Sequence, residues 1–113
     1  WRTLKNTGAH VVFASDWPVS NVDPILGIQS AMTRKPWAEG LPDHSYTLHE
    51  VIAGYTVEGA YAEFAEATKG RLKPGYLADF VVLSHDIEAV DPEKLDTVHP
   101  VTTVCGGRVT YQA

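Results

Sequence analysis

Asp16 is the residue whose type and place most suggest chemistry, because its carboxylate directly follows an uninterrupted apolar run. Residues 11–14 read Val-Val-Phe-Ala, which predicts a strand buried on both faces, as in the parallel sheet of an α/β protein. Side chains just beyond the carboxyl ends of such strands line the ligand crevice, and Pro18 fixes the direction in which the chain leaves. Asp16 is therefore a candidate for acting on a bound ligand; alternatively, it caps a turn or the next helix.

Two tryptophans and a second aspartate are the next candidates. Trp17 follows Asp16 and either lines a substrate pocket or packs against a neighbouring element. Trp37 lies in a long loop, where a lid role is open but anchoring of the core is the simpler expectation. Asp79 precedes a predicted strand without any partner motif, so we interpret it as a structural hydrogen-bond acceptor. Three glutamates at helical spacing indicate a solvated face: Glu58, Glu63 and Glu66.

The histidines and the cysteine show no metal-binding pattern. No H-x-H or H-x-x-x-H pair is present, so we interpret all five histidines as structural or surface groups: His10, His44, His49, His85 and His99. Cys105 is alone, which rules out an internal disulfide and a cysteine-based zinc cluster within this chain, and it reads as a small buried residue.

Length and composition bound the class of protein. The 113 residues suit one domain, and a hydrophobic content of 44% is ordinary for a folded chain. With 14 acidic and 9 basic residues the net charge is −5, so we expect no nucleic-acid partner. No apolar run is long enough to cross a bilayer and no leader opens the chain, so we expect a cytoplasmic protein without a membrane partner. The start at Trp1 and the single internal Met32 indicate a piece of a longer protein.

The first half of the chain predicts three helices and one long loop. Residues 2–6 look like the tail of a helix that Gly8 caps. Asp23 and Pro24 predict the start of the next helix, whose apolar face holds Ile25, Ile28 and Met32.

A loop then precedes a strongly marked helix start. Residues 33–46 read as a loop near the upper limit for an ordinary connection, which suggests a role around a site or packing over a barrel rim. Thr47 and Glu50 have the spacing of a capping box, which predicts a helix from this point. A further helical segment is expected from Val57 until Gly70 ends it.

The last third of the chain predicts strands. Residues 73–75, Lys-Pro-Gly, suit a type II turn, and residues 78–83 read as the strand that follows it. Residues 91–94 suggest a short helical turn. Residues 101–105 and 108–111 flank two glycines that can take the positive φ angles of a tight hairpin turn.

Four segments of the sequence, taken in order, carry a family resemblance. They read Ala-Ser-Asp-Trp-Pro-Val at 14–19, Tyr-Thr-Val-Glu-Gly-Ala-Tyr at 55–61, Lys-Gly-Arg-Leu-Lys-Pro-Gly-Tyr-Leu-Ala-Asp-Phe-Val-Val-Leu at 69–83, and Thr-Val-Cys-Gly-Gly-Arg-Val-Thr-Tyr at 103–111. Together they resemble the C-terminal end of the metal-dependent amidohydrolases, most closely the amidohydrolase family 3 group that includes N-substituted formamide deformylase-like proteins.

The resemblance implies a composite α/β fold. Residues 1–69 would form the C-terminal end of a (β/α)8 barrel, with residues 11–14 as its eighth strand followed by the closing helices. Residues 70–113 would supply the C-terminal strands of a small β-sandwich, and the chain would be a fragment of the whole enzyme.

The resemblance also implies a site. Asp16 matches the family's strand-eight aspartate, which lies beside one or two divalent metals, usually zinc, and acts as general base for the metal-bound water. The substrate would be a small amide or cyclic amide, with Trp17 lining its pocket. The family's other metal ligands would precede Trp1, so we expect Asp16 to bind metal only together with them, and this fragment to be inactive and metal-free alone.

An alternative hypothesis gives the chain no catalytic role. It would then be a stand-alone structural or oligomerising module derived from such an enzyme. Its exposed strand edges and apolar helix faces would be covered by the upstream part of the same polypeptide or by a second copy.

Overall fold

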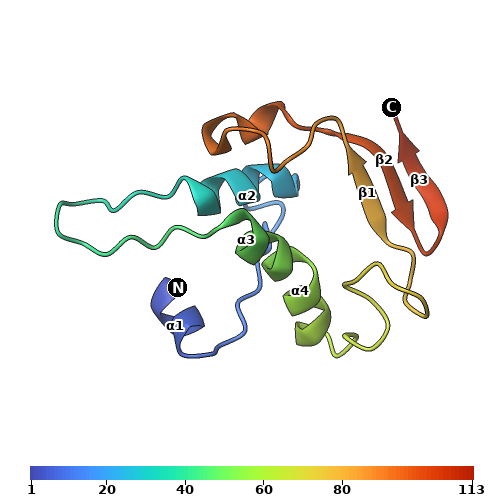
Figure 1. Ribbon diagram of the computed structural model, residues 1–113, viewed down its shortest axis with the longest axis horizontal. Coiled ribbons are helices and arrows are strands. Elements are labelled where there is room, and N and C mark those ends of the chain that lie inside the picture. The colour runs from blue at the N-terminus through green and yellow to red at the C-terminus, as the bar shows by residue number, and fades with distance from the viewer.

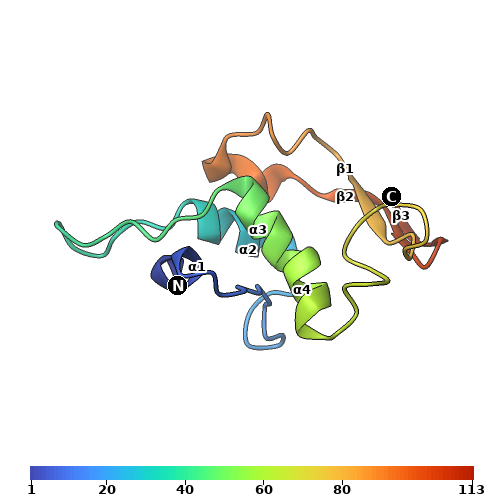
Figure 2. The same cartoon turned by 60° about the horizontal axis from the view of Figure 1, so that its bottom comes forward.

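The computed structural model describes residues 1–113 and separates the helices from a small sheet at the C-terminal end (Figure 1). The helices are α1 (Arg2–Asn6), α2 (Pro24–Met32), α3 (Leu48–Tyr55), α4 (Val57–Ala62) and a 3₁₀-helix, η1 (Pro92–Thr97). The strands are β1 (Phe80–Leu83), β2 (Pro100–Cys105) and β3 (Arg108–Gln112). The loop of residues 33–46 projects away from the body of the molecule in both views (Figures 1 and 2).

The predicted helix starts are confirmed, because the side chains that make them are local. Asp23 accepts a hydrogen bond from the Ile25 amide at 2.9 Å, and Pro24 occupies the first turn of α2. Thr47 and Glu50 form the expected capping box at the start of α3.

The predicted end of α4 at Gly70 is wrong. The helix stops at Ala62, and Phe64 takes a left-handed backbone conformation with φ of 60°. The Ala65 amide then donates to the Ala60 carbonyl at 2.8 Å and the Phe64 amide donates to Tyr61 at 3.0 Å. These are the two hydrogen bonds of a Schellman motif, so the backbone closes the helix early although the residue in the left-handed position is not glycine.

The strand predicted at residues 11–14 is present only as an extended segment. No strand within residues 1–113 pairs with it, so no ladder of hydrogen bonds forms. Its Phe13 amide instead donates to the Gly54 carbonyl of α3 at 3.3 Å. Residues 11, 13 and 15 are partly buried whereas 12, 14 and 16 are exposed, so one face of the segment is covered and the other is open.

The sheet confirms the predicted hairpin. Its order is β1-β2-β3 with both pairs antiparallel, and Gly106 and Gly107 make the turn with φ of 56° and 77°. Asp79 accepts a hydrogen bond from the Gly106 amide at 2.6 Å, which confirms its structural role. The predicted strand at 78–83 begins at Phe80. The barrel and the sandwich stay predictions, as do the boundaries at 1–69 and 70–113.

The core is small and lies where α2, α3 and η1 meet. Its six buried residues are Ile25, Ile28, Tyr46, Val51, Leu95 and Val98. The radius of gyration is 15.1 Å, against about 13 Å for a compact domain of this length. Trp37 is 90% exposed and Cys105 is exposed, so the predictions that they are buried are wrong. No helix of this structure combines the length and the apolar character that crossing a membrane requires.

Candidate functional site

Asp16 sits at a sharp turn that ends the extended segment. Its φ is 53°, a left-handed conformation that aspartate tolerates better than most residues. The Val19 amide donates to the Asp16 carbonyl at 2.8 Å, and the Ser20 hydroxyl donates to the Ser15 carbonyl at 2.9 Å. The Asp16 side chain is exposed, and the cap of the following helix is Asp23 instead. The backbone of the turn therefore fixes Asp16 while its carboxylate stays open.

Phe13 anchors the segment that carries Asp16. Its ring meets Tyr46 edge-on at 5.3 Å between centroids and stacks on Tyr55 at 5.7 Å. The third side of the ring faces Gly54, where an added Cβ would lie 2.3 Å from Phe13 Cδ2. The absent side chain of Gly54 thus lets the segment approach α3 closely.

Tyr55 connects this anchor to α2. Its hydroxyl packs against Gly27, where an added Cβ would lie 2.0 Å from the Tyr55 hydroxyl oxygen. Burial raises the pKa of the Tyr55 hydroxyl, so this group stays protonated at neutral pH. A cavity of about 360 Å³ lies beside it and is lined by Tyr55, Ser15, Ser20 and Asn21 among others. Polar groups therefore line the space next to the Asp16 turn.

Trp17 is 68% exposed beside Asp16. Its amide donates to the Ser15 hydroxyl at 3.3 Å, which fixes the backbone and leaves the indole in the open. Its role in substrate binding stays a prediction.

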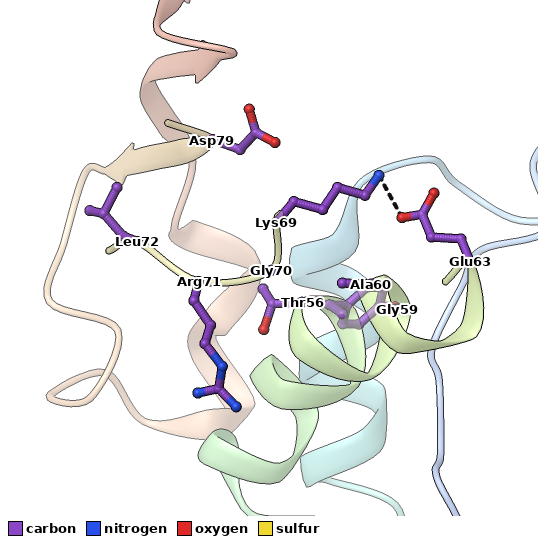
Figure 3. A pocket seen from close by; sticks show the side chains of 10 residues that line it. Thr56, Gly59, Ala60, Glu63, Lys69, Gly70, Arg71, Leu72 and Asp79 are labelled. Atoms are coloured by element: carbon purple, nitrogen blue, oxygen red, sulfur yellow. Dashed lines mark ion pairs between the residues drawn. The ribbon is translucent and has the colours of Figure 1, made fainter. Parts of the chain in front are cut away.

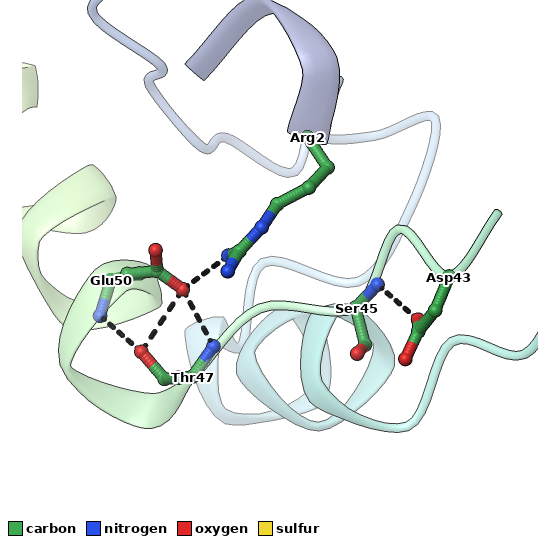
Figure 4. Close-up of polar contacts among 5 residues, drawn as sticks. All are labelled: Arg2, Asp43, Ser45, Thr47 and Glu50. Carbon is green, nitrogen blue, oxygen red and sulfur yellow. Dashed lines mark hydrogen bonds and ion pairs between the residues drawn. The ribbon is translucent and has the colours of Figure 1, made fainter. Parts of the chain in front are cut away.

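A charged network joins α1 to the start of α3 (Figure 4). The Arg2 guanidinium donates to Glu50 Oε2, which also accepts the Thr47 amide at 2.9 Å. Burial by itself raises the pKa of the Glu50 carboxyl, but the hydrogen bonds from the Thr47 backbone and from Arg2 outweigh it and lower the pKa below 4.5. Nearby, the Ser45 amide donates to the Asp43 carboxylate at 2.7 Å, and this hydrogen bond lowers the pKa of Asp43. Both carboxylates are structural.

A second cavity, of about 370 Å³, lies between α4 and residues 69–79 (Figure 3). Lys69 forms an ion pair with Glu63 on its rim, and this hydrogen bond raises the pKa of Lys69. Arg71 and Asp79 add one charge of each sign. Asp16 does not line this cavity. The positive and negative side chains that line the cavity balance, so the cavity selects neither anions nor cations.

The residues present do not form a metal site. No group of three or more His, Cys, Asp or Glu side chains comes together within residues 1–113. His10 contacts Glu58 and stacks on Tyr61, with 3.9 Å between ring centroids, so its ring is used in packing α4. Glu58 pairs with His10 and Glu63 pairs with Lys69, while Glu63 and Glu66 are exposed, as expected of a solvated face. Asp16 alone cannot hold a metal.

The sequence profile described as “Amidohydrolase family” matches residues 1–111, so the chain belongs to the amidohydrolase family.

The chain is similar to two known proteins, and the name of the first agrees with that assignment. YtcJ of Bacillus subtilis (strain 168), whose name provisionally describes it as an amidohydrolase, is 38% identical over 99% of this chain. The Arabidopsis thaliana protein LONG AFTER FAR-RED 3 is 34% identical over 74% of it. The chain spans 22% and 15% of the lengths of these relatives. No solved structure matches it significantly.

Sequence reasoning missed Gly54 as part of the support of Asp16. The available signal was a glycine inside the predicted helix that Thr47 caps, where glycine costs about 1 kcal/mol relative to alanine and commonly marks close packing. What approaches that glycine depends on the tertiary fold, so the sequence alone could not identify Phe13 as its partner.

Proposed function

We propose that this chain supplies the general base of an enzyme that hydrolyses carbon–nitrogen bonds in small amides or cyclic amides, in the manner of N-substituted formamide deformylases. The observation that carries the proposal is the placement of Asp16. Its carboxylate is exposed on a turn with φ of 53°, at the end of an extended segment, in a chain of the amidohydrolase family. Residues that the surrounding structure holds in a left-handed backbone conformation cluster at functional sites, and the carboxylate of Asp16 is free to act there.

In the proposed reaction Asp16 moves one proton twice. Its carboxylate accepts a proton from water as the water oxygen attacks the carbonyl carbon of the amide. The resulting carboxyl then donates that proton to the nitrogen as the carbon–nitrogen bond breaks. The products are a carboxylic acid and an amine, and Asp16 returns to its charged form. The exposed Trp17 would cover the substrate on one side.

A divalent metal, zinc by preference, belongs to the proposal because the family is generally metal-dependent. Within residues 1–113 no group of three or more His, Cys, Asp or Glu side chains forms around Asp16. All other ligands would therefore come from outside these residues, and the 113 residues alone would be inactive.

The fold proposal follows from the same segment. One face of residues 11–15 packs on the helices and the other is open, as expected of a barrel strand whose inner face the rest of the barrel would cover. We propose that residues 1–69 complete a (β/α)8 barrel and that residues 70–113 join a β-sandwich. The single Cys105 fits a cytoplasmic location.

A second candidate function is a non-catalytic module that associates with another protein surface. It is favoured by the large apolar side chains exposed in this structure, among them Trp1, Val19, Phe64 and Leu72. Their cover would be the rest of the same polypeptide or a second copy of this chain.

The test is a hydrolysis assay of the full-length protein on N-alkyl formamides, linear amides and cyclic amides, with release of the amine measured. Asp16→Asn should lower kcat by about 10²–10⁴-fold. Asp96→Asn is the matched control, because Asp96 is an exposed aspartate on η1. A wild-type protein that hydrolyses none of these amides would favour the non-catalytic module.

A further inference from the structure

Gly54 lies at the closest approach between α3 and the segment that ends at Asp16. The Phe13 amide donates to the Gly54 carbonyl at 3.3 Å, so the backbone of the segment is in direct contact with the backbone of α3. A Cβ at this position would lie 2.3 Å from Phe13 Cδ2, 2.8 Å from Phe13 Cε2 and 3.2 Å from the Val11 carbonyl oxygen. These separations are shorter than van der Waals contact, so any side chain here must displace the segment.

The Phe13 ring cannot relieve this overlap by turning aside. It is held between the rings of Tyr46 and Tyr55, at 5.3 Å and 5.7 Å. Tyr46 is buried in the core, and the Tyr55 hydroxyl is seated against Gly27 of α2. Because both neighbours are fixed, the displacement passes to the backbone of residues 11–15.

We propose that Gly54 is a positioning residue for Asp16. By leaving room for Phe13, Gly54 sets how closely the extended segment packs on α3. The position of this segment in turn sets the position of the Asp16 carboxylate, three residues after Phe13. The inference rests on the proposed function of Asp16 for its catalytic consequence, while the contact itself does not. Restoring contact at 3.4 Å or more from a Cβ at 2.3 Å requires a shift of about 1 Å, and a displacement of that size can cost about 100-fold in rate.

The experiment compares Gly54→Ala with Gly59→Ala in the full-length protein. Both glycines are helical, but a Cβ at Gly59 has 3.8 Å to its nearest neighbour, so it fits without any shift. We expect Gly54→Ala to lower kcat for amide hydrolysis by about 10–100-fold, with KM within about twofold and measured at a temperature where every variant is folded. Gly59→Ala should match the wild type.

Two further readouts separate positioning from general destabilisation. Hydrogen exchange of the peptide covering residues 11–19 should be faster in Gly54→Ala and unchanged in Gly59→Ala. Adding Phe13→Leu to Gly54→Ala removes the ring that collides with the new methyl group, so this double variant should recover most of the lost kcat.

A Gly54→Ala protein with kcat within twofold of an active wild type, or with unchanged exchange over residues 11–19, would overturn the inference. Equal losses in Gly54→Ala and Gly59→Ala would overturn it as well. Failure of the proposed function looks different: the wild type would not hydrolyse amides or Asp16→Asn would stay active, while the exchange result would still decide whether Gly54 holds the segment.

Discussion

Replacement of Glu50 separates two interactions that its carboxylate makes at once. Glu50 Oε2 accepts the Thr47 amide and so closes the capping box of α3, and it pairs with Arg2 of α1. Glu50→Ala removes both interactions. Glu50→Gln keeps an oxygen that can accept the Thr47 amide but loses the charge that attracts Arg2.

The expected magnitudes follow from the exposure of the two partners. The cap is worth about 1 kcal/mol. The ion pair is partly exposed, with side-chain exposures of 31% for Arg2 and 25% for Glu50, so it contributes about 0.5–1 kcal/mol. Glu50→Ala should therefore lower the free energy of unfolding by about 1.5–2 kcal/mol, and Glu50→Gln by about 0.5–1 kcal/mol, at pH 7.

The pH dependence gives a sharper test. Hydrogen bonds in the folded state lower the pKa of Glu50 below its usual value of 4.5. A depressed folded pKa stabilises the protein at pH values above the unfolded pKa, and this stabilisation is lost as pH falls through the folded pKa. The difference between wild type and Glu50→Gln should thus be full at pH 7 and should vanish in acid, once the wild-type carboxyl is protonated.

Urea unfolding followed by circular dichroism, at a series of pH values from neutral to acid, measures this difference. Arg2→Met combined with Glu50→Gln completes a double-mutant cycle that isolates the ion pair. A Glu50→Gln variant that is as destabilised in acid as at pH 7 would refute the reasoning, and so would a Glu50→Ala variant as stable as the wild type.

Two further predictions concern stability. Leu95, on η1, is 1% exposed in the core, so Leu95→Ala should cost about 3 kcal/mol in urea unfolding, whereas Leu72→Ala, at an exposed position, should cost under about 0.5 kcal/mol; similar costs for both would contradict the assigned core. Asp79 accepts the Gly106 amide at 2.6 Å, so Asp79→Ala should lower the unfolding free energy by about 1 kcal/mol and Asp79→Asn by less, because the amide oxygen still accepts; equal effects of the two changes would count against that hydrogen bond.

The features that the sequence predicted well are those decided within a few residues. Asp23 with Pro24, Thr47 with Glu50, and the paired glycines of the hairpin each satisfy or redirect backbone groups beside them. Their structures therefore depend little on what packs around them.

The features that the sequence did not predict depend on distant partners or on backbone closure. A strand at residues 11–14 needs a neighbour to pair with, and the 113 residues supply none. Phe64 takes a left-handed conformation that its residue type disfavours, so no glycine in the sequence marks the end of α4. Trp37 has the type of a core residue, yet it lies on a loop that projects from the body and is 90% exposed.

The sequence likewise predicted one part of the candidate site and not the other. Asp16 was found from the sequence because an acid after an apolar run is a local pattern. Its support by Phe13, Gly54 and Tyr55 was not, since those contacts join segments about forty residues apart along the chain.

The measurement that bears most directly on the central claim is kcat of Asp16→Asn in the full-length protein, with the best amide substrate at saturation and Asp96→Asn alongside. If Asp16 is the general base, its amide variant should retain no more than about one hundredth of the wild-type kcat with KM little changed, and Asp96→Asn should equal the wild type. An Asp16→Asn protein that keeps more than about a tenth of wild-type kcat, a loss far below that of a missing general base, would contradict the claim.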